Sequence, residues 1–272
     1  IIKKEILEIK EKYNTPRLSE ICINYDDIDI ADLIPREDVV ISMTHLGYVK
    51  RLPVTEYRAQ HRGGVGVTAH KTKDEDFVER LFTTNTHDDL LFFTNKGKVY
   101  VIKAYEIPEA QRTAKGRAII NLLPLDATER VSAVVRRKEG DVGNFIMATK
   151  LGLIKKTESK EFDKIRKNGK VAITLREGDE LIGVHLTNGE NNILLGSSSG
   201  KCINFNESVI RNSSRIAQGV KSINLSGGET VVGMTIVDEG AEILTITENG
   251  YGKRTDIAEY REQGRGGKGT KA

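Results

Sequence analysis

Two glycine-rich stretches that contain an arginine are the residues best suited to chemistry in this sequence, and that chemistry is the binding of phosphate. They read Gln60-His61-Arg62-Gly63-Gly64-Val65-Gly66 and Gln263-Gly264-Arg265-Gly266-Gly267-Lys268-Gly269. Glycines let a backbone come within hydrogen-bonding distance of a phosphate, and an arginine beside them supplies a bidentate fork. Each stretch is therefore a candidate contact for a nucleic-acid backbone, with a flexible surface loop as the alternative.

The two stretches are the first and last members of a series of five. Their final glycines belong to a set spaced about fifty residues apart: Gly66, Gly116, Gly169, Gly219 and Gly269. An arginine stands four positions before four of these glycines, at Arg62, Arg112, Arg215 and Arg265. In the third member Ile165 holds that position and Arg166 follows it. The spacing predicts one structural unit repeated five times.

Each unit also contains a tight turn between apolar runs. A hydroxyl residue, two further residues and a glycine recur, ending at Gly47, Gly97, Gly152, Gly200 and Gly250. A type I turn of this length needs positive φ at its end, where glycine is least strained, so we expect one hairpin per repeat. Runs of strand length lie at 39–44, 48–52, 81–84, 90–94, 99–103, 119–123, 131–135, 145–149, 181–187, 193–195, 231–237 and 243–247. The sequence predicts an all-β, propeller-like fold of four-stranded blades, and the absence of Trp argues against the WD40 type.

The ends of the chain differ from the repeats. Apolar residues at positions 2, 6, 9 and 13 form a helical stripe, so residues 1–13 are expected to be the end of a longer, coiled-coil helix. Residues 14–37 then form a linker that can add one strand, and residues 38–272 form the propeller, with a sixth blade absent or incomplete. The chain starts without Met and is expected to be a fragment.

Several kinds of site are disfavoured by the sequence. The five histidines are scattered singly and predict no metal site. The run Asp74-Glu75-Asp76 ends ten residues after Gly66. The same position in the next three repeats holds Asp126, Asp179 and Glu229, so we expect a solvated turn there. No catalytic constellation or nucleotide-binding motif is found, so we predict no catalytic site and no cofactor. Cys22 and Cys202 are expected to be reduced thiols of a cytosolic protein, and neither a membrane span nor a signal peptide is predicted.

Basic residues are the remaining candidates. The chain has 42 basic and 39 acidic residues and a formal net charge of +3, so a charged surface requires segregation in space. Three cation pairs follow the hairpin glycines, and one member of each should project outward because adjacent strand residues face opposite ways; a solvated strand edge is the alternative. Other cations flank the second glycines, which predicts a basic band and an acidic band. The candidate DNA-binding residues are Gln60, His61, Arg62, Gly63, Gly64, Gly66, Lys50, Arg51, Arg112, Lys115, Arg117, Lys155, Lys156, Arg166, Lys167, Lys170, Arg215, Lys253, Arg254, Gln263, Arg265, Gly266, Gly267 and Lys268.

These motifs resemble a known family. The fifty-residue repeat, the Q-x-R-G-G-x-G stretch, GRAIINLLPL at 116–125 and NGYGKRT at 249–255 are similar to the C-terminal domain of the A subunit of DNA gyrase. The resemblance implies a β-pinwheel whose basic outer rim wraps double-stranded DNA without reading its sequence. It further implies a bacterial, cytoplasmic, nucleoid-associated protein whose partners are the rest of the gyrase A protein together with the gyrase B protein. Negative supercoiling would need ATP and Mg in the holoenzyme, whereas this domain would need no cofactor.

Two alternatives stay open beside that resemblance. One is the equivalent domain of topoisomerase IV, and the other is a propeller that binds proteins. The two Arg-Gly-Gly copies favour gyrase, and the repeated arginine favours DNA. The family's box has the pattern Q-[KR]-R-G-G-[KR]-G in the first blade; the first copy departs from it at His61 and Val65, and the second copy only at Gly264. Position therefore favours the first copy as the box, and residue match favours the second.

Overall fold

The computed structural model describes residues 2–16, 19, 30–57, 76–138 and 140–272. The chain divides into two compact units, Ile1–Pro35 and Arg36–Ala272. The first unit contains α1 (Ile2–Tyr13) and the 3-10 helix η1 (Ile30–Leu33). Helix α1 spans the range over which the apolar stripe predicts a helix, and its apolar side chains are exposed. None of the helices in the described residues is long and apolar enough to span a membrane.

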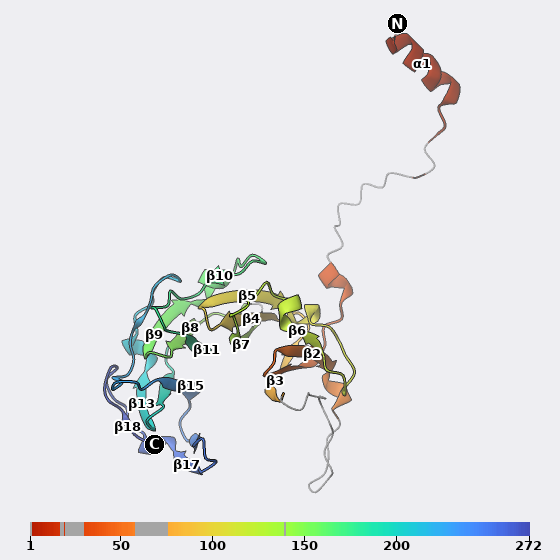
Figure 1. Ribbon diagram of the computed structural model, residues 1–272. Helices are drawn as coiled ribbons and strands as arrows, with labels where there is room; N and C mark the ends of the chain where they lie inside the picture. Colours follow the sequence, from red (N-terminus) through yellow and green to blue (C-terminus); the bar gives the residue numbers. More distant parts are fainter. Residues whose placement is uncertain (1, 17–18, 20–29, 58–75, 139) are drawn as a thin grey trace. The chain divides into compact units, whose positions relative to one another are not determined.

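Residues 36–272 form a row of antiparallel sheets (Figure 1). The first sheet has the order β3 (Val78–Asn85), β1 (Asp38–Thr44), β2 (Tyr48–Pro53), β6 (Arg117–Ala118), and the second has β7 (Val131–Arg137), β4 (Asp89–Thr94), β5 (Lys98–Lys103), β10 (Lys170–Val171). The third has β11 (Leu181–Thr187), β8 (Asn144–Thr149), β9 (Leu153–Glu158), β14 (Val220–Lys221), and the fourth has β15 (Val231–Val237), β12 (Asn192–Ser197), β13 (Lys201–Asn206), β18 (Thr270–Lys271). Strands β16 (Glu242–Ile246) and β17 (Gly252–Asp256) form a two-stranded sheet. The predicted four-stranded, propeller-like architecture is confirmed.

The fourth strand of each four-stranded sheet comes from the following repeat. Strand β6 follows Gly116 of the second repeat, yet it pairs with β2 of the first through Tyr48↔Ala118 and Val49↔Arg117. Strands β10, β14 and β18 complete the next three sheets in the same way. Figure 1 shows β10 and β18 on the outer side of the row, and β7, β11 and β15 on its inner side. Successive repeats are therefore interlocked by backbone hydrogen bonds at the outer edge.

The hairpin turns agree with the sequence prediction. Their five glycines have φ between 72° and 81°, where a side chain is strained. The apolar run 119–123 was expected to be a strand, and that prediction is wrong. It forms η4 (Ile119–Asn121), because Ile119 and Leu123 share the buried face of one turn, with the Leu123 N–H donating to the Ile119 carbonyl at 2.9 Å. The other 3-10 turns are η2 (Val54–Glu56), η3 (Ala104–Glu106), η5 (Ser159–Phe162), η6 (Glu207–Val209) and η7 (Ile257–Glu259).

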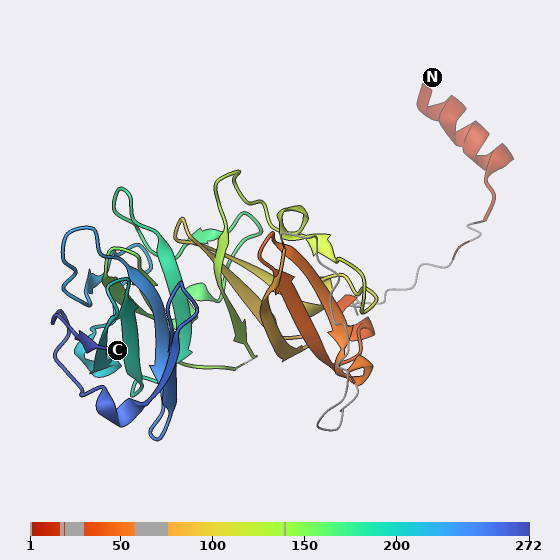
Figure 2. The same ribbon diagram turned by 60° about the horizontal axis from the view of Figure 1, so that its bottom comes forward.

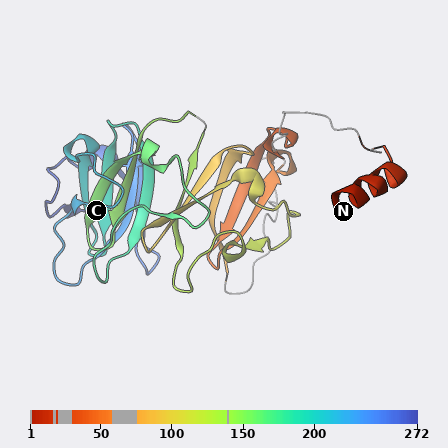
Figure 3. The same ribbon diagram turned by 90° about the horizontal axis from the view of Figure 1, so that it is seen from above.

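The core lies between neighbouring sheets, which follow one another in chain order (Figures 2 and 3). Consecutive strand residues point to opposite faces, so Leu90 and Phe92 of β4 pack toward β1, while Leu91 and Phe93 pack toward β8. This two-sided burial explains why the hairpin strands read as continuous apolar runs rather than as alternating ones. Cys202 is a free, buried thiol, and burial raises its pKa. Cys22 lies outside the described residues.

We expect hairpin glycines to differ in how much they tolerate a side chain. Gly97→Ala adds positive-φ strain of about 1–2 kcal/mol and places a Cβ 2.5 Å from the Ile173 carbonyl oxygen. Gly200→Ala is the matched control, since Gly200 has similar φ but nothing within 4 Å of the added Cβ. Urea denaturation should show a larger loss of unfolding free energy for Gly97→Ala. Equal losses would contradict the close packing of this turn against the outer strand.

Candidate nucleic-acid interface

The repeated Arg-Gly stretches form loops along one edge of the sheets. We call the segments 111–117, 166–171, 215–221 and 265–271 the outer loops, because each ends in or next to the short strand β6, β10, β14 or β18. Each lies at the edge of its sheet opposite β3, β7, β11 or β15. Their cations are exposed or half-buried: Arg112, Lys115, Arg117, Arg166, Lys167, Lys170, Arg215, Lys221, Arg265, Lys268 and Lys271. The outer loops therefore bring together most of the predicted cations that flank the second glycines.

Successive outer loops are joined to one another. The Arg215 guanidinium donates to the Val171 carbonyl, and the Arg265 guanidinium donates to the Lys221 carbonyl. The Gly266 N–H also donates to the Ser222 carbonyl at 2.7 Å. The repeated arginine therefore has a structural role that the sequence did not reveal, since it ties its own loop to the outer strand of the repeat before it. From the third repeat to the fifth, the outer loops form one connected basic band.

Glycines in the outer loops allow these loops to pack closely against the backbone of the preceding repeat. A Cβ added at Gly116 would lie 2.6 Å from the Val49 carbonyl oxygen, and one added at Gly269 would lie 2.7 Å from that of Cys202. Both residues also have positive φ. Gly266 differs, because an added Cβ would have nothing within 4 Å. Gly266 is therefore required for its positive φ of 85° rather than for close packing, and its N–H is already bonded to the Ser222 carbonyl.

Two of the predicted outward cation pairs are instead buried, so that prediction is wrong for them. Lys50 is fully buried, and its Nζ donates to the carbonyls of Gln111, Arg112 and Ala114. The Arg51 side chain is also largely covered; its Nε donates to the Ile107 carbonyl at 3.2 Å. Buried ammonium and guanidinium groups need such partners. Carbonyls supplied by the next repeat explain why neither side chain projects outward.

The pair in the third repeat behaves in the same way. The Lys155 Nζ donates to the carbonyls of Ala172 and Arg215, and the Lys156 Nζ donates to the Glu207 carbonyl at 3.0 Å. In the fifth repeat Lys253 and Arg254 are exposed, and the Arg254 Nε lies 3.2 Å from the Glu242 carboxylate. They lie on β17, which belongs to the two-stranded sheet.

The recurring acidic residues are not a solvated, acidic band. Asp76 and Asp179 are buried, and each accepts the N–H of a hairpin-turn residue, Leu46 at 3.0 Å and Leu151 at 2.8 Å. Only Asp126 is strongly exposed, because the buried acid of the second repeat is Glu129, which accepts a hydrogen bond from Thr94 at 2.6 Å. Glu229 is largely covered and accepts from the Ser226 N–H. These carboxylates fasten each hairpin turn to the start of the inner strand; Asp74 and Glu75 lie outside the described residues.

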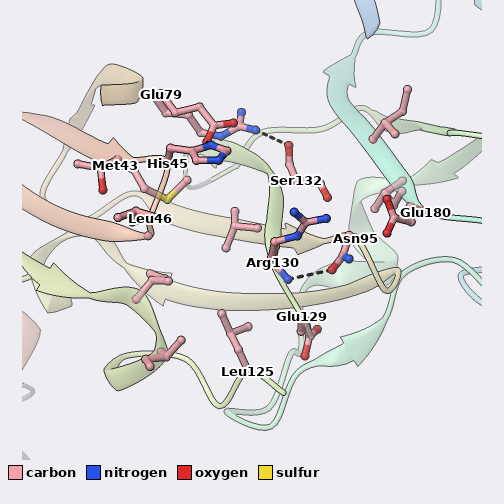
Figure 4. A pocket seen from close by; sticks show the side chains of 18 of the residues that line it. Met43, His45, Leu46, Glu79, Asn95, Leu125, Glu129, Arg130, Ser132 and Glu180 are labelled. Carbon is pink, nitrogen blue, oxygen red and sulfur yellow. Dashed lines mark hydrogen bonds and ion pairs between the residues drawn. The ribbon is translucent and has the colours of Figure 1, made fainter. Parts of the chain in front are cut away.

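A pocket of about 650 Å³ is lined mainly by residues of the first three sheets, together with Val232 of the fourth. Figure 4 shows Arg130 beside Asn95, with the Arg130 N–H donating to the Asn95 side-chain oxygen at 2.8 Å. His45 lies 3.2 Å from Glu79, and the Arg80 guanidinium donates to the Ser132 carbonyl. The Glu129 carboxylate accepts hydrogen bonds from the hydroxyls of Thr94 and Tyr100. The polar groups of this pocket therefore mainly hold turns and strands together.

Known proteins share this arrangement. A family model described as the DNA gyrase C-terminal domain, beta-propeller, matches residues 38–85, 88–136, 143–188, 191–238 and 241–272. The chain belongs to the DNA gyrase C-terminal domain family. The A subunit of DNA gyrase from Staphylococcus epidermidis (strain ATCC 12228 / FDA PCI 1200) is 47% identical over 276 residues, covering 100% of the chain and 31% of that protein. Its counterpart from Staphylococcus aureus (strain MRSA252) is 45% identical over the same shares. The chain thus spans about a third of the length of these relatives.

Solved structures agree with this family. A DNA gyrase A C-terminal domain superposes with a TM-score of 0.69 at 31% identity, covering 86% of this chain and 76% of that one. The C-terminal domain of a DNA topoisomerase IV has a TM-score of 0.73 at 30% identity, covering 87% of this chain and 73% of that one. Gyrase and topoisomerase IV domains therefore share the fold, and the family model and the curated relatives assign the chain to gyrase.

Only the second of the two copies of the gyrase-type box lies within the described residues. Gln60, His61, Arg62, Gly63, Gly64 and Gly66 lie outside the described residues, so their role stays a prediction. The second copy is described. The Gln263 N–H donates to the Asn204 carbonyl at 2.8 Å, and Arg265 and Lys268 are exposed. This copy is fixed at one end by backbone pairing and presents its cations to solvent.

The buried Lys155 predicts a pH dependence of stability. Burial, with a contribution from Arg215, lowers its pKa from the usual 10.5 to about 7. Between pH 7 and 10 the unfolded chain then binds more protons than the native one, so the unfolding free energy rises with pH, by at most about 1.4 kcal/mol per pH unit from this group. Urea denaturation at pH 7, 8 and 9 should show a smaller rise for Lys155→Met than for the parent. Parallel curves would contradict the lowered pKa.

Proposed function

We propose that the chain binds duplex DNA through its outer loops, without sequence preference, and bends the duplex along them. The observation that carries this proposal is the basic band, in which exposed cations recur on one edge of successive sheets. Neutralising phosphates with Lys and Arg releases counterions, and this supplies most of the free energy of non-specific binding. Fixed spacing between repeats supports several simultaneous contacts with one duplex.

The form of the outer surface favours contacts with phosphates over contacts with bases. The outer loops consist of turns and two-residue strands, whereas reading the major groove requires an inserted helix or β-ribbon. Exposed arginine and lysine side chains on these loops, as at Arg265 and Lys268, suit phosphate oxygens. We therefore assign the outer loops to backbone contacts, which position DNA but carry no direct sequence information.

Bending follows from the arrangement of the sheets within residues 36–272. The outer strands lie along the convex side of a curved row (Figure 1), so a duplex that contacts them all must curve. Bending 20–30 base pairs by 40–90° costs about 1–6 kcal/mol. Additional phosphate contacts made along the curve offset that cost. Wrapping therefore requires several outer loops to bind the duplex at once, rather than one strong site.

In the parent protein we propose that this bending serves DNA gyrase. The curated relatives are whole subunits of DNA gyrase, and wrapping by this part would orient DNA for an ATP-driven introduction of negative supercoils. The proposed partners are double-stranded DNA, the rest of the gyrase A protein and the gyrase B protein, in the bacterial cytoplasm at the nucleoid. ATP and Mg would bind elsewhere in the holoenzyme, and this part would position DNA without chemistry.

The salt dependence of duplex binding tests the proposal. With on the order of six phosphates engaged, log K should fall with log salt at a slope of about −5. The experiment measures mobility shifts of an arbitrary duplex and a scrambled one across a salt series. A slope near zero, or a strong preference for one duplex, would overturn binding by the outer loops.

A matched pair of double variants locates the contacts. Arg166→Ala with Lys167→Ala removes two exposed cations of an outer loop, and the slope should become shallower by about 2. Arg136→Ala with Lys138→Ala is the control, because it also removes two exposed cations but at the end of β7, on the opposite edge of the same sheet. The control should keep the slope of the parent. Equal effects would mean that net charge, rather than the outer loops, drives binding.

A further inference from the structure

One position of each of the first four hairpins lies beneath an outer loop. It is the third residue after the hairpin glycine, and it is Lys50, Tyr100, Lys155 and Ile203 in the first four repeats. The Lys50 Nζ donates to three carbonyls of the loop 111–117, and the Lys155 Nζ donates to the Arg215 carbonyl of the loop 215–221. Tyr100 lies against Gly169, and Ile203 lies against Gly267. The position therefore supports the outer loop of the next repeat in all four sheets.

Lysine at this position is not explained by packing. Tyr100 and Ile203 fill the same place as uncharged side chains, so the fold accepts an uncharged residue there. A buried ammonium is destabilising unless it is well paired. In the part of the chain that the structure describes, Lys50 and Lys155 form no ion pair with a carboxylate, and their partners are backbone carbonyls. Two sheets thus keep a buried lysine amino group, a strong hydrogen-bond donor, directly under a basic loop.

The contacts of Lys50 determine the shape of the loop above it. Its three N–H groups match three carbonyls, those of Gln111 at 3.2 Å, Arg112, and Ala114 at 2.9 Å. The next cation of the loop, Lys115, lies over the ring of Tyr48 at 4.2 Å from its centroid. Besides pairing with β6, strand β2 therefore holds the loop through two side chains: that of Lys50 bonds to the main chain of the loop, and that of Tyr48 contacts Lys115. Arg112 and Arg117, which are exposed, are left facing solvent.

We propose that Lys50 and Lys155 are positioning residues for DNA binding: each fixes the main chain of the outer loop of the next repeat, so that its exposed cations meet phosphates. This inference rests on the proposed DNA binding by the outer loops. It divides the outer loops into two kinds. Loops 111–117 and 215–221 lie over a buried lysine amino group, and loops 166–171 and 265–271 lie over the uncharged side chains of Tyr100 and Ile203.

The test is a double-mutant cycle in the 272-residue chain. Lys50→Met and Arg112→Ala should each weaken duplex affinity, by about three- to tenfold, and the double variant should be little weaker than either one alone, since both act through the same loop. Hydrogen exchange should be faster at the amides of residues 111–117 in Lys50→Met. A purely structural role would leave duplex affinity unchanged or make the two effects multiply. Affinity equal to that of the parent, or fully multiplicative effects, would overturn the proposal.

Lys156→Met is the matched control for burial. Lys156 is also a buried lysine bonded to a carbonyl, but that carbonyl belongs to Glu207 in η6, outside the outer loops. This variant should lose stability and keep the parent's duplex affinity; an equal loss of affinity would assign the effect of Lys50→Met to general destabilisation. If Lys50→Met does not fold, Lys155→Met with Arg215→Ala gives the same cycle in the third sheet. A parent chain that fails to bind DNA would overturn the proposed function itself, whereas a binding parent with an equally tight Lys50→Met overturns only this inference.

Discussion

Backbone pairing between one repeat and the next is the interaction on which the rest of the structure depends. Each outer strand contributes only two paired residues, such as Val49↔Arg117 and Tyr48↔Ala118. So short a strand has little stability of its own. The turn glycine that admits the neighbouring backbone and the side chains beneath the loop supply the remaining contacts. The same residues therefore complete a sheet and place a cation on the outer edge, which makes the basic band a consequence of how the repeats interlock.

Burial separates the charges of a nearly neutral chain. Asp76, Asp179 and Glu129 are withdrawn from the surface because they fasten hairpin turns. Lys50 and Lys155 are withdrawn as well, but they lie beneath the outer loops and leave the exposed cations of those loops in place. Formal net charge is only +3, so a whole-chain average conceals the segregation. The charge at the outer edge depends on which charged side chains are exposed there, not on how many the chain contains.

Local features could be predicted from the sequence, and features that join distant repeats could not. The turn at Gly97 is specified by its own four residues, and it was predicted with its positive φ. The burial of Lys50 depends on carbonyls about sixty residues later, which no pattern around Lys50 reveals. Strand β9 does not stand out as an apolar run because Lys155 and Lys156 interrupt its pattern, and β6 was missed because two residues carry no periodicity. The run from Ile119 to Leu123 looked like a strand, although its burial follows one turn of 3-10 helix.

The proposed function requires the outer loops together to bend duplex DNA along a defined path. It is tested most directly by sealing a nicked circular plasmid with ligase in the presence of increasing amounts of the chain, then removing the protein and measuring the linking number. A chain that wraps DNA with a fixed hand should shift the topoisomer distribution in one direction, in proportion to the protein bound. A distribution that stays unchanged at concentrations that saturate binding would rule out wrapping, because the outer loops would then bind DNA without bending it round a fixed path.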